Sequence, residues 1–416
     1  MAASFDSAWV RAQFPAFQDP ELEGFIHAEN AGGSFACEAV IQRLDRFYRR
    51  TKLQPYYPSA PSTAGGEAMD ESRARLASWL GVMDDELLLG PSTTQNSYVL
   101  AQALRGWLQP GDEVVVTEQD HEANVGAFHR LGEAGFTVRL WKVDPTSGEL
   151  DEAGLDAVLS DRTRVVAFTH CSNIVGSVNP VAAWCDKIRA AGAMSIVDGV
   201  SYAPHGMPNV RELGADAYLF SLYKVYGPHL GVMTLRKEWN ERLPNQGHFF
   251  NVDKPSARFT PAGPDHAQIG AVAGVIDYLE ALDRQHHPDA DRSGAPARAH
   301  ALMRDREQAL VQPLLDFVVA HPRLGLVGRP TAEGRAPTVS MTVEGTTPQA
   351  ICEALAERGI GTGYGNFYAW RLMEALGIDP DIGVLRCSFV HYNTPGEVDA
   401  LIAALRELLA DSTGAD

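Results

Sequence analysis

Short apolar runs alternate with amphipathic segments in the part of the chain between about Glu86 and Leu235. The apolar runs have the length of buried β-strands and fall at Asp112–Thr117, Thr137–Val143, Thr163–His170, Ser195–Asp198 and Ala217–Ser221. The amphipathic segments have helical periodicity and fall at Asn124–Ala134, Asp151–Leu159 and Val181–Ala191. This alternation predicts an α/β fold with a large, mostly parallel sheet and helices on both of its faces.

The pattern changes after a helical run at Ile269–Leu282, where the hydrophilic segment His286–Ala297 is predicted to be a hinge. Helices are then predicted at Ala299–Val319, Pro348–Arg358 and Thr394–Leu409, and strands at Leu324–Val327, Thr338–Val343 and Val384–Phe389. This order predicts a smaller α+β C-terminal domain. We therefore divide the chain into a large domain (26–285), a small domain (286–416) and an N-terminal segment (1–25) that packs on the small domain.

The composition narrows the possible partners. The 416 residues include 35 Lys and Arg against 53 Asp and Glu, a net charge of −18. Such an acidic surface repels phosphate backbones and anionic lipid, so we expect neither nucleic acid nor a membrane as a partner. No apolar stretch approaches the roughly 20 residues of a membrane helix, and Met1–Pro20 lacks the pattern of a secretory signal. Five cysteines without a C-x-x-C pair argue against a metal site, and we expect a cytoplasmic protein with reduced thiols.

Candidate chemistry begins at Lys224, which follows the strand Ala217–Ser221 and precedes Val225-Tyr-Gly-Pro228. A lysine in a partly desolvated pocket has a lowered pKa and becomes a nucleophilic amine for carbonyl chemistry. An exposed loop lysine is the alternative interpretation.

Polar residues at other predicted strand ends favour the first interpretation, because ligands bind at the carboxyl ends of parallel strands. Asp198 ends a strand upstream of Lys224, and a carboxylate there suits the ring nitrogen of pyridoxal 5′-phosphate (PLP). The segment Gly90–Asn96 precedes a helical stretch, Ser97–Leu104, and hydroxyls and N–H groups at a helix start bind anions. Ordinary helix or turn capping remains the alternative for both segments.

Six motifs occur in an order that resembles aminotransferase class V, in the cysteine desulfurase-like branch of fold-type I PLP enzymes. They are Thr93-Thr94-Gln95, Asp120-His-Glu-Ala-Asn124, His170-Cys-Ser-Asn173, Val197-Asp-Gly-Val-Ser201, Ser221-Leu-Tyr-Lys-Val-Tyr-Gly-Pro228 and Arg386-Cys-Ser-Phe-Val-His-Tyr-Asn-Thr394. The resemblance runs from about Glu29 to the C-terminus. It implies PLP as cofactor, the fold-type I transferase architecture, a homodimer and a small amino-acid substrate.

The resemblance also implies roles for individual residues. Three are catalytic: Lys224 forms the Schiff base, Asp198 pairs with the pyridinium nitrogen and His121 stacks on the ring. Further cofactor contacts are Thr93, Thr94, Asn173, Ser201, Ser221 and Tyr223. Arg386 grips the substrate α-carboxylate, because a planar fork suits that task, although a structural salt bridge is the alternative. Further substrate contacts are Asn173, Asn30, Ala31, Tyr364 and Asn366, with simple loop packing as the alternative for Tyr364 and Asn366.

The chain also departs from the family pattern. Ser201 stands in place of a glutamine and Tyr223 in place of a histidine, and Pro264 replaces a threonine that reaches a neighbouring subunit's phosphate. The loop that carries the persulfide-forming cysteine in desulfurases corresponds to Gly361–Trp370, which holds aromatic residues and no cysteine. Cys352 falls in a predicted helix, and Cys387 is predicted to face away from Arg386 on its strand.

We therefore expect an enzyme that binds an α-amino acid through PLP and Lys224 and removes the Cα proton. β-Elimination without an enzyme persulfide, as in a C–S lyase, is the favoured continuation. Transamination, epimerisation and cysteine desulfuration remain alternatives, as does a catalytically silent binding protein with the same fold.

Overall fold

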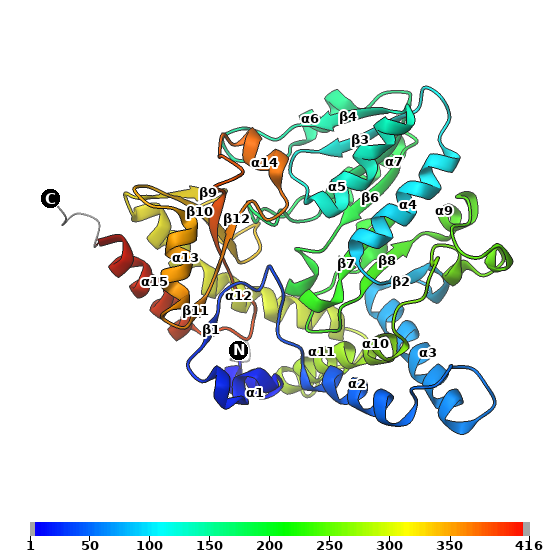
Figure 1. Cartoon of the computed structure of the whole chain (residues 1–416), viewed down its shortest axis with the longest axis horizontal. Coiled ribbons are helices and arrows are strands. Elements are labelled where there is room, and N and C mark those ends of the chain that lie inside the picture. Colours follow the sequence, from blue (N-terminus) through cyan, green and yellow to red (C-terminus); the bar gives the residue numbers. More distant parts are fainter. Residues whose placement is uncertain (1–4, 411–416) are drawn as a thin grey trace.

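A computed structural model describes residues 5–410, which contain three sheets: one of seven strands, one of four and a short two-stranded pair (Figure 1). The larger sheet has seven strands in the order β2-β8-β7-β6-β5-β3-β4. Their bounds are β2 Leu87–Gly90, β8 Gly231–Leu235, β7 Ala217–Ser221, β6 Met194–Asp198, β5 Thr163–Thr169, β3 Glu113–Thr117 and β4 Thr137–Trp141. The run from β4 to β7 is parallel, whereas β8 is antiparallel to both of its neighbours. The expected α/β architecture with a mostly parallel sheet is confirmed.

Helices cover both faces of this sheet because its strands are apolar on both sides. Val114 and Val116 pack with the helices α4, α5 and α9, whereas Val115 packs with α3, α7 and α11. The helices of this domain are α2 Glu38–Arg50, α3 Ala60–Leu80, α4 Thr93–Trp107, α5 Glu122–His129, α6 Glu152–Val158, α7 Val181–Ala190, α8 Val210–Leu213, α9 Lys237–Arg242, α10 His266–Ala271 and α11 Ala273–His286.

The second sheet is antiparallel, with the strand order β12-β13-β10-β9. Its strands are β9 Leu324–Val327, β10 Thr338–Val343, β12 Gly363–Gly365 and β13 Val384–Ser388. The helices around it are α12 Ala295–Ala320, α13 Pro348–Ala356, α14 Trp370–Ala375 and α15 Pro395–Ala410, and this domain lies on the left of Figure 1. A short parallel pair, β1 (Ile26–His27) with β11 (Ile360–Gly361), joins the start of the chain to this domain.

Some predicted bounds were wrong for local reasons. The predicted helix Asn124–Ala134 is α-helical only to His129 and ends in a 3₁₀ turn, because Gly135 closes it with φ 92°. The hinge predicted at His286–Ala297 is shorter, since α12 begins at Ala295 with Pro296 in its first turn, where proline is well tolerated. The helical run predicted at Ile269–Leu282 is two helices that meet at Val272.

The start of the chain contacts both domains. Helix α1 (Ser7–Ala12) pairs with the small domain where Arg11 contacts Glu397 at 2.7 Å. The ring of Phe14 packs edge-on against Tyr278 of the large domain and Tyr392 of the small one. The division at residues 25 and 285 stays a prediction.

Candidate active site

Polar residues converge where the order of the parallel strands reverses. The chain places β4 on one side of β3 and β5 on the other, so a crevice opens beyond the ends of β3 and β5. A cavity of about 140 Å³ lies at this edge. It is lined by Ser92, Thr93, Thr94, His121, Asn173, Asp198, Ser201, Ser221, Tyr223, Lys224 and His229, among others. The cavity thus brings together nine residues that the sequence analysis assigned to the cofactor, and it adds Ser92 and His229.

Lys224 is buried, with 7% of its surface exposed, in the turn after β7. Burial lowers the pKa of its ammonium from 10.5 to about 8, and the positive charge of Arg386 acts in the same direction. Asp198 and Glu29 oppose this shift. A buried lysine with a lowered pKa has the properties of a nucleophilic amine rather than of a surface lysine.

Asp198 ends β6 within the same cavity, and its Oδ1 accepts a hydrogen bond of 2.8 Å from the Val200 N–H. Burial raises the pKa of this carboxyl group to about 6, whereas the Val200 N–H and Lys224 lower it. A buried carboxylate with a raised pKa gains stability from a cationic partner, which a protonated pyridine nitrogen would supply.

His121 caps the start of α5, where its Nδ1 accepts a hydrogen bond of 3.0 Å from the Ala123 N–H. Burial lowers the pKa of His121 to about 3, helped by the charges of Lys224 and Arg386. The imidazole is therefore neutral, and with Nδ1 as acceptor its proton is on Nε2. A neutral, flat ring suits stacking on an aromatic cofactor.

One group of residues that line the cavity suits a phosphate group. Helix α4 begins there at Thr93, and its first N–H groups have no acceptor within the helix. The Thr93 hydroxyl lies 2.7 Å from that of Ser221, and the Ser92 hydroxyl accepts from the Gln95 N–H at 3.1 Å. Beside them the ring of Tyr223 stacks on His229, with 5.0 Å between centroids and 7° between planes. His229 was not among the residues predicted from the sequence, and its position just after Gly227-Pro228 is the only sequence signal for it.

One buried polar atom in this cavity lacks a partner among the described residues. Asn173 donates through Nδ2 to the Phe367 carbonyl at 3.0 Å, while its Oδ1 is buried and makes no hydrogen bond. Buried amide oxygens are normally satisfied. The free acceptor, the buried amine, the carboxylate and the anion-binding helix start together fit the donor and acceptor groups of PLP.

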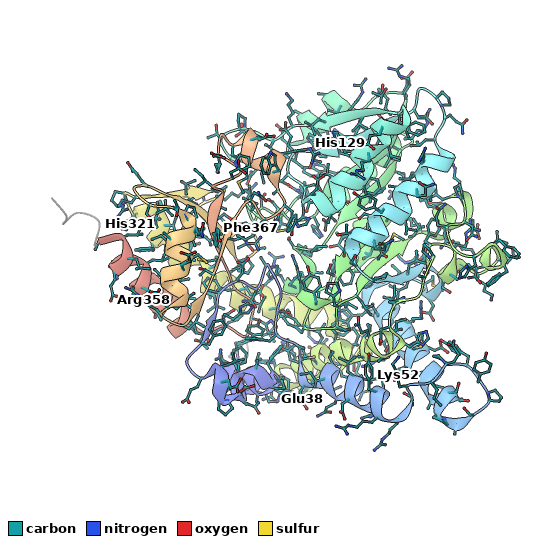
Figure 2. The ribbon with its side chains drawn as sticks, in the orientation of Figure 1. Glu38, Lys52, His129, His321, Arg358 and Phe367 are labelled. Carbon is teal, nitrogen blue, oxygen red and sulfur yellow. The ribbon has the colours of Figure 1, made fainter. Side chains whose placement is uncertain are left out.

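Arg386 contacts Asn173 at the wall of the cavity but already has an acidic partner. Its Nη1 donates to the Asn173 carbonyl at 3.0 Å, its Nε donates to Glu29 Oε1 at 3.2 Å, and its Nη2 also pairs with Glu29. The ring of Phe367, labelled between the two domains in Figure 2, lies 3.7 Å from the Arg386 Cζ. Glu29 was not among the residues predicted from the sequence, although the next two residues, Asn30 and Ala31, were.

Asn30 and Ala31 form hydrogen bonds with the small domain. Asn30 donates to the Ser388 carbonyl at 3.1 Å and accepts from the Tyr392 hydroxyl, and the Ala31 N–H donates to Ser388 Oγ at 2.8 Å. The Asn30 side chain therefore uses its amide donor and acceptor within the protein, and it serves to hold the small domain.

The loop after β12 also differs from expectation. Tyr364 pairs with Leu385, next to Arg386 in β13, so it projects from the opposite face of the sheet and drops out of the candidate site. Asn366 shapes its own loop, since it donates to the Pro380 carbonyl at 3.1 Å and accepts from the Tyr368 N–H at 2.9 Å. Tyr368 instead reaches the site, with its ring centroid 5.1 Å from that of His121.

All five cysteines are free, and four of them are buried. Burial raises the pKa of the Cys37, Cys171 and Cys185 thiols to about 12, and it raises the pKa of Cys387 further. Cys352 lies on α13 and donates to the Thr362 carbonyl at 3.2 Å. Within residues 5–410 no group of His, Cys, Asp and Glu could hold a metal ion, and no helix is long and apolar enough to cross a membrane.

Comparison with known proteins gives a consistent result. The family model "Aminotransferase class-V" matches residues 26–401. "Aminotransferase-like protein FGM3" of Gibberella zeae is 35% identical over 98% of this chain and 100% of its own length. A "Cysteine desulfurase" of Pectobacterium atrosepticum is 28% identical over 96% of this chain and 97% of its own. The crystal structure of the cysteine desulfurase CsdA from Escherichia coli superposes with a TM-score of 0.82 at 25% identity, covering 98% of this chain and 99% of that one.

Proposed function

The chain belongs to the aminotransferase class V family of PLP-dependent enzymes, and we propose that it acts on an α-amino acid through Lys224 and catalyses β-elimination. One observation carries the proposal: Lys224 and Asp198 are buried in the same cavity as the start of α4. When bound, PLP supplies an aldehyde for an amine and a ring that withdraws electrons from the substrate Cα.

The residues of the chain have complementary tasks in this proposal. Asp198 would hold the proton on the pyridine nitrogen, and the neutral ring of His121 would fix the plane of the cofactor. Lys224 would hold the cofactor at rest and then, as a free amine, accept the Cα proton. Thr93, Thr94, Ser221 and Tyr223 would bind the phosphate, and Ser201 would contact the cofactor beside Asp198.

A direct experiment tests the role of Lys224. The purified protein is expected to be yellow, and reduction with borohydride followed by peptide mapping should place the pyridoxyl label on Lys224. The variant Lys224→Ala should lose the label and the activity, whereas Lys52→Ala, at a lysine far from the cavity, should retain both. A label on another lysine, or a protein that binds no PLP, would refute the proposal.

The continuation by β-elimination rests on the position of the thiols. The loop Gly361–Trp370 contains Phe367 and Tyr368 but no cysteine, and four cysteines are buried. A persulfide-forming thiol has to be mobile and ionised. Without one, the leaving group would depart from Cβ with its electron pair, and Lys224 would take the Cα proton.

Cysteine desulfurase is the second candidate, favoured by the curated relatives and the similar crystal structure. Incubation with L-cysteine, alkylation and mass spectrometry separate the two functions. β-Elimination predicts pyruvate, ammonia and sulfide without protein-bound sulfur, whereas a stoichiometric persulfide on Cys352 would establish the desulfurase. A product that depends on an added keto acid would indicate transamination, and loss of optical activity alone would indicate epimerisation.

We also propose a homodimer, as in typical members of this family, and a cytoplasmic location. The five unpaired cysteines support the location, because disulfides persist in oxidising compartments.

A further inference from the structure

The cation that the family resemblance assigns to the substrate α-carboxylate is already bound to a carboxylate of its own chain. All three guanidinium nitrogens of Arg386 donate hydrogen bonds, Nε and Nη2 to Glu29 and Nη1 to the Asn173 carbonyl. The ring of Phe367 covers one guanidinium face at 3.7 Å. Arg386 is 3% exposed, so a substrate carboxylate has no open approach to it while this arrangement persists.

The Glu29 carboxylate fills the space beside Gly363, where a side chain on that residue would otherwise lie. A Cβ atom on Gly363 would lie 2.7 Å from Glu29 Oε1 and 2.8 Å from its Cδ, so only glycine at this position leaves room for the carboxylate. Gly363 pairs with Arg386 across β12 and β13, so the space that holds the Glu29 carboxylate lies beside the guanidinium group.

The backbone at Glu29 is fixed as well. The Ser388 N–H donates to the Ala28 carbonyl at 2.7 Å, and the Ala31 N–H donates to Ser388 Oγ at 2.8 Å. Only the side chain of Glu29, which is 18% exposed, is left to move.

We propose that Glu29 is an internal counter-ion that the α-carboxylate of the substrate displaces from Arg386. The inference rests on the proposed function, because it concerns the substrate of the same site. Exchanging one carboxylate for another conserves the charge around Arg386, so the exchange needs no unpaired buried ion. Glu29 therefore competes with the substrate and sets its affinity, and it keeps Arg386 paired when an amine without a carboxylate binds.

The test uses the holoenzyme and two probes, L-alanine and ethylamine. Both carry the reacting amine, neither has a leaving group on Cβ, and only L-alanine has an α-carboxylate. Their Kd values are measured from the visible absorbance of the cofactor and by calorimetry. In Glu29→Gln the Kd of L-alanine should fall by about tenfold or more, because a charge-assisted competitor has been removed. The Kd of ethylamine should stay the same.

A second variant keeps every charge. In Gly363→Ala the new methyl group would lie within 2.9 Å of both the Glu29 carboxylate and the Phe367 ring, the two groups that cover Arg386, so the Kd of L-alanine should fall in this variant too. Glu344→Gln, at an exposed glutamate, serves as the matched control and should change neither Kd.

An unchanged or weaker affinity for L-alanine in both variants would overturn the role of Glu29. Equal tightening of L-alanine and ethylamine would also overturn it, since that result would indicate a general opening of the site. A wild-type protein without cofactor on Lys224 would instead refute the proposed function, so the two failures are distinguishable.

Discussion

At the residue scale, the charge state of Lys224 decides when the site can react. Its ammonium has a pKa lowered from 10.5 to about 8, so the neutral amine becomes the major form as the pH rises through about 8. Only the neutral amine attacks an aldehyde. We predict that the apoprotein takes up PLP at a rate that rises with pH and levels off above about 8, measured by the absorbance of the bound cofactor.

A substitution that removes the charge of Arg386 tests the origin of this pH dependence. Arg386 lowers the Lys224 pKa, so Arg386→Gln should move the midpoint of the rate profile to higher pH. A wild-type midpoint near 10.5 would contradict the buried position of Lys224.

Tyr223 and His229 are predicted to retain the cofactor at its phosphate end. Pro264 offers neither a hydroxyl nor an N–H at the position where the family resemblance implies a threonine, and the stacked pair lines the cavity together with Thr93 and Ser221. Loss of one hydrogen bond to a charged group costs about 1.5–3 kcal/mol, so Tyr223→Phe should weaken PLP binding by roughly 10- to 100-fold.

Equilibrium dialysis of PLP measures this effect independently of activity. Tyr364→Phe serves as the control because it also removes a tyrosine hydroxyl. Tyr364 projects from the face of the small sheet that lies opposite to Arg386, so this change should leave the PLP affinity unchanged. Equal affinities for Tyr223→Phe and the wild type would exclude a phosphate contact.

At the element scale, the start of α4 is positioned by backbone contact with β8. A Cβ on Gly231 would lie 2.2 Å from the carbonyl carbon of Ser92 and 2.5 Å from the Thr93 nitrogen. Backbone atoms there have no room to yield, so we predict that Gly231→Ala destabilises the protein by about 1–3 kcal/mol and displaces the anion-binding turn. Thermal unfolding and PLP dialysis measure the two effects.

Gly396 gives the matched control for this substitution. It lies in the first turn of α15, and a Cβ there would meet nothing within 4 Å. Gly396→Ala should leave PLP binding unchanged and cost no stability. If Gly231→Ala binds PLP as the wild type does, the start of α4 is not the phosphate site.

The loop before α14 links the two domains over the cavity. Phe367 and Tyr368 have φ of 48° and 59°, values that non-glycine residues adopt at a cost. Contacts from the large domain hold them there: Asn173 donates to the Phe367 carbonyl at 3.0 Å, and the Glu122 N–H donates to the Tyr368 carbonyl at 2.8 Å. The aromatic cover therefore depends on the packing of one domain against the other.

At the scale of the whole molecule, a buried polar chain links the two halves of the site. Tyr226, two residues after Lys224, donates to the Pro204 carbonyl at 2.5 Å, and its hydroxyl lies 3.2 Å from His391 Nδ1. Burial lowers the pKa of His391 to about 3, so this small-domain imidazole is neutral, and Tyr278 bonds its other nitrogen. The contact between Tyr226 and His391 therefore connects the turn that contains Lys224 to the segment that follows Arg386 in the small domain.

The proposed dimer is tested on the intact protein. The large apolar side chains that are exposed include Tyr48, Tyr56 and Tyr57 in one segment and Phe249 and Phe250 in another, the last two being 85% and 62% exposed. Exposed apolar groups of this size favour association. Light scattering is expected to give twice the 45.1 kDa of one chain.

Substitution of the exposed phenylalanines gives the control. Phe249→Ser together with Phe250→Ser should weaken the dimer, whereas Val319→Ser, at an exposed position on α12, should not. A wild-type protein that is fully active as a monomer would refute the proposed assembly.

The sequence by itself determined the five parallel strands β3 to β7 of the large sheet and the grouping of most residues that line the cavity, whereas strands β2 and β8 were not predicted. Parallel strands direct their carboxyl ends to one edge, so residues that follow β3, β5, β6 and β7 had to meet there. This is why Asp198 and Lys224 could be placed together from local pattern, and why His121 and Asn173, which the family motifs added, lie beside them.

Only the tertiary structure decided what surrounds Arg386. Glu29 lies 357 positions away along the chain, and no local periodicity relates the two residues. The register of β12 against β13 turned Tyr364 away and put Gly363 beside Arg386. Local sequence fixes the period of a strand but not the partner or the register of strands that are distant along the chain, because those depend on the packing of the whole domain.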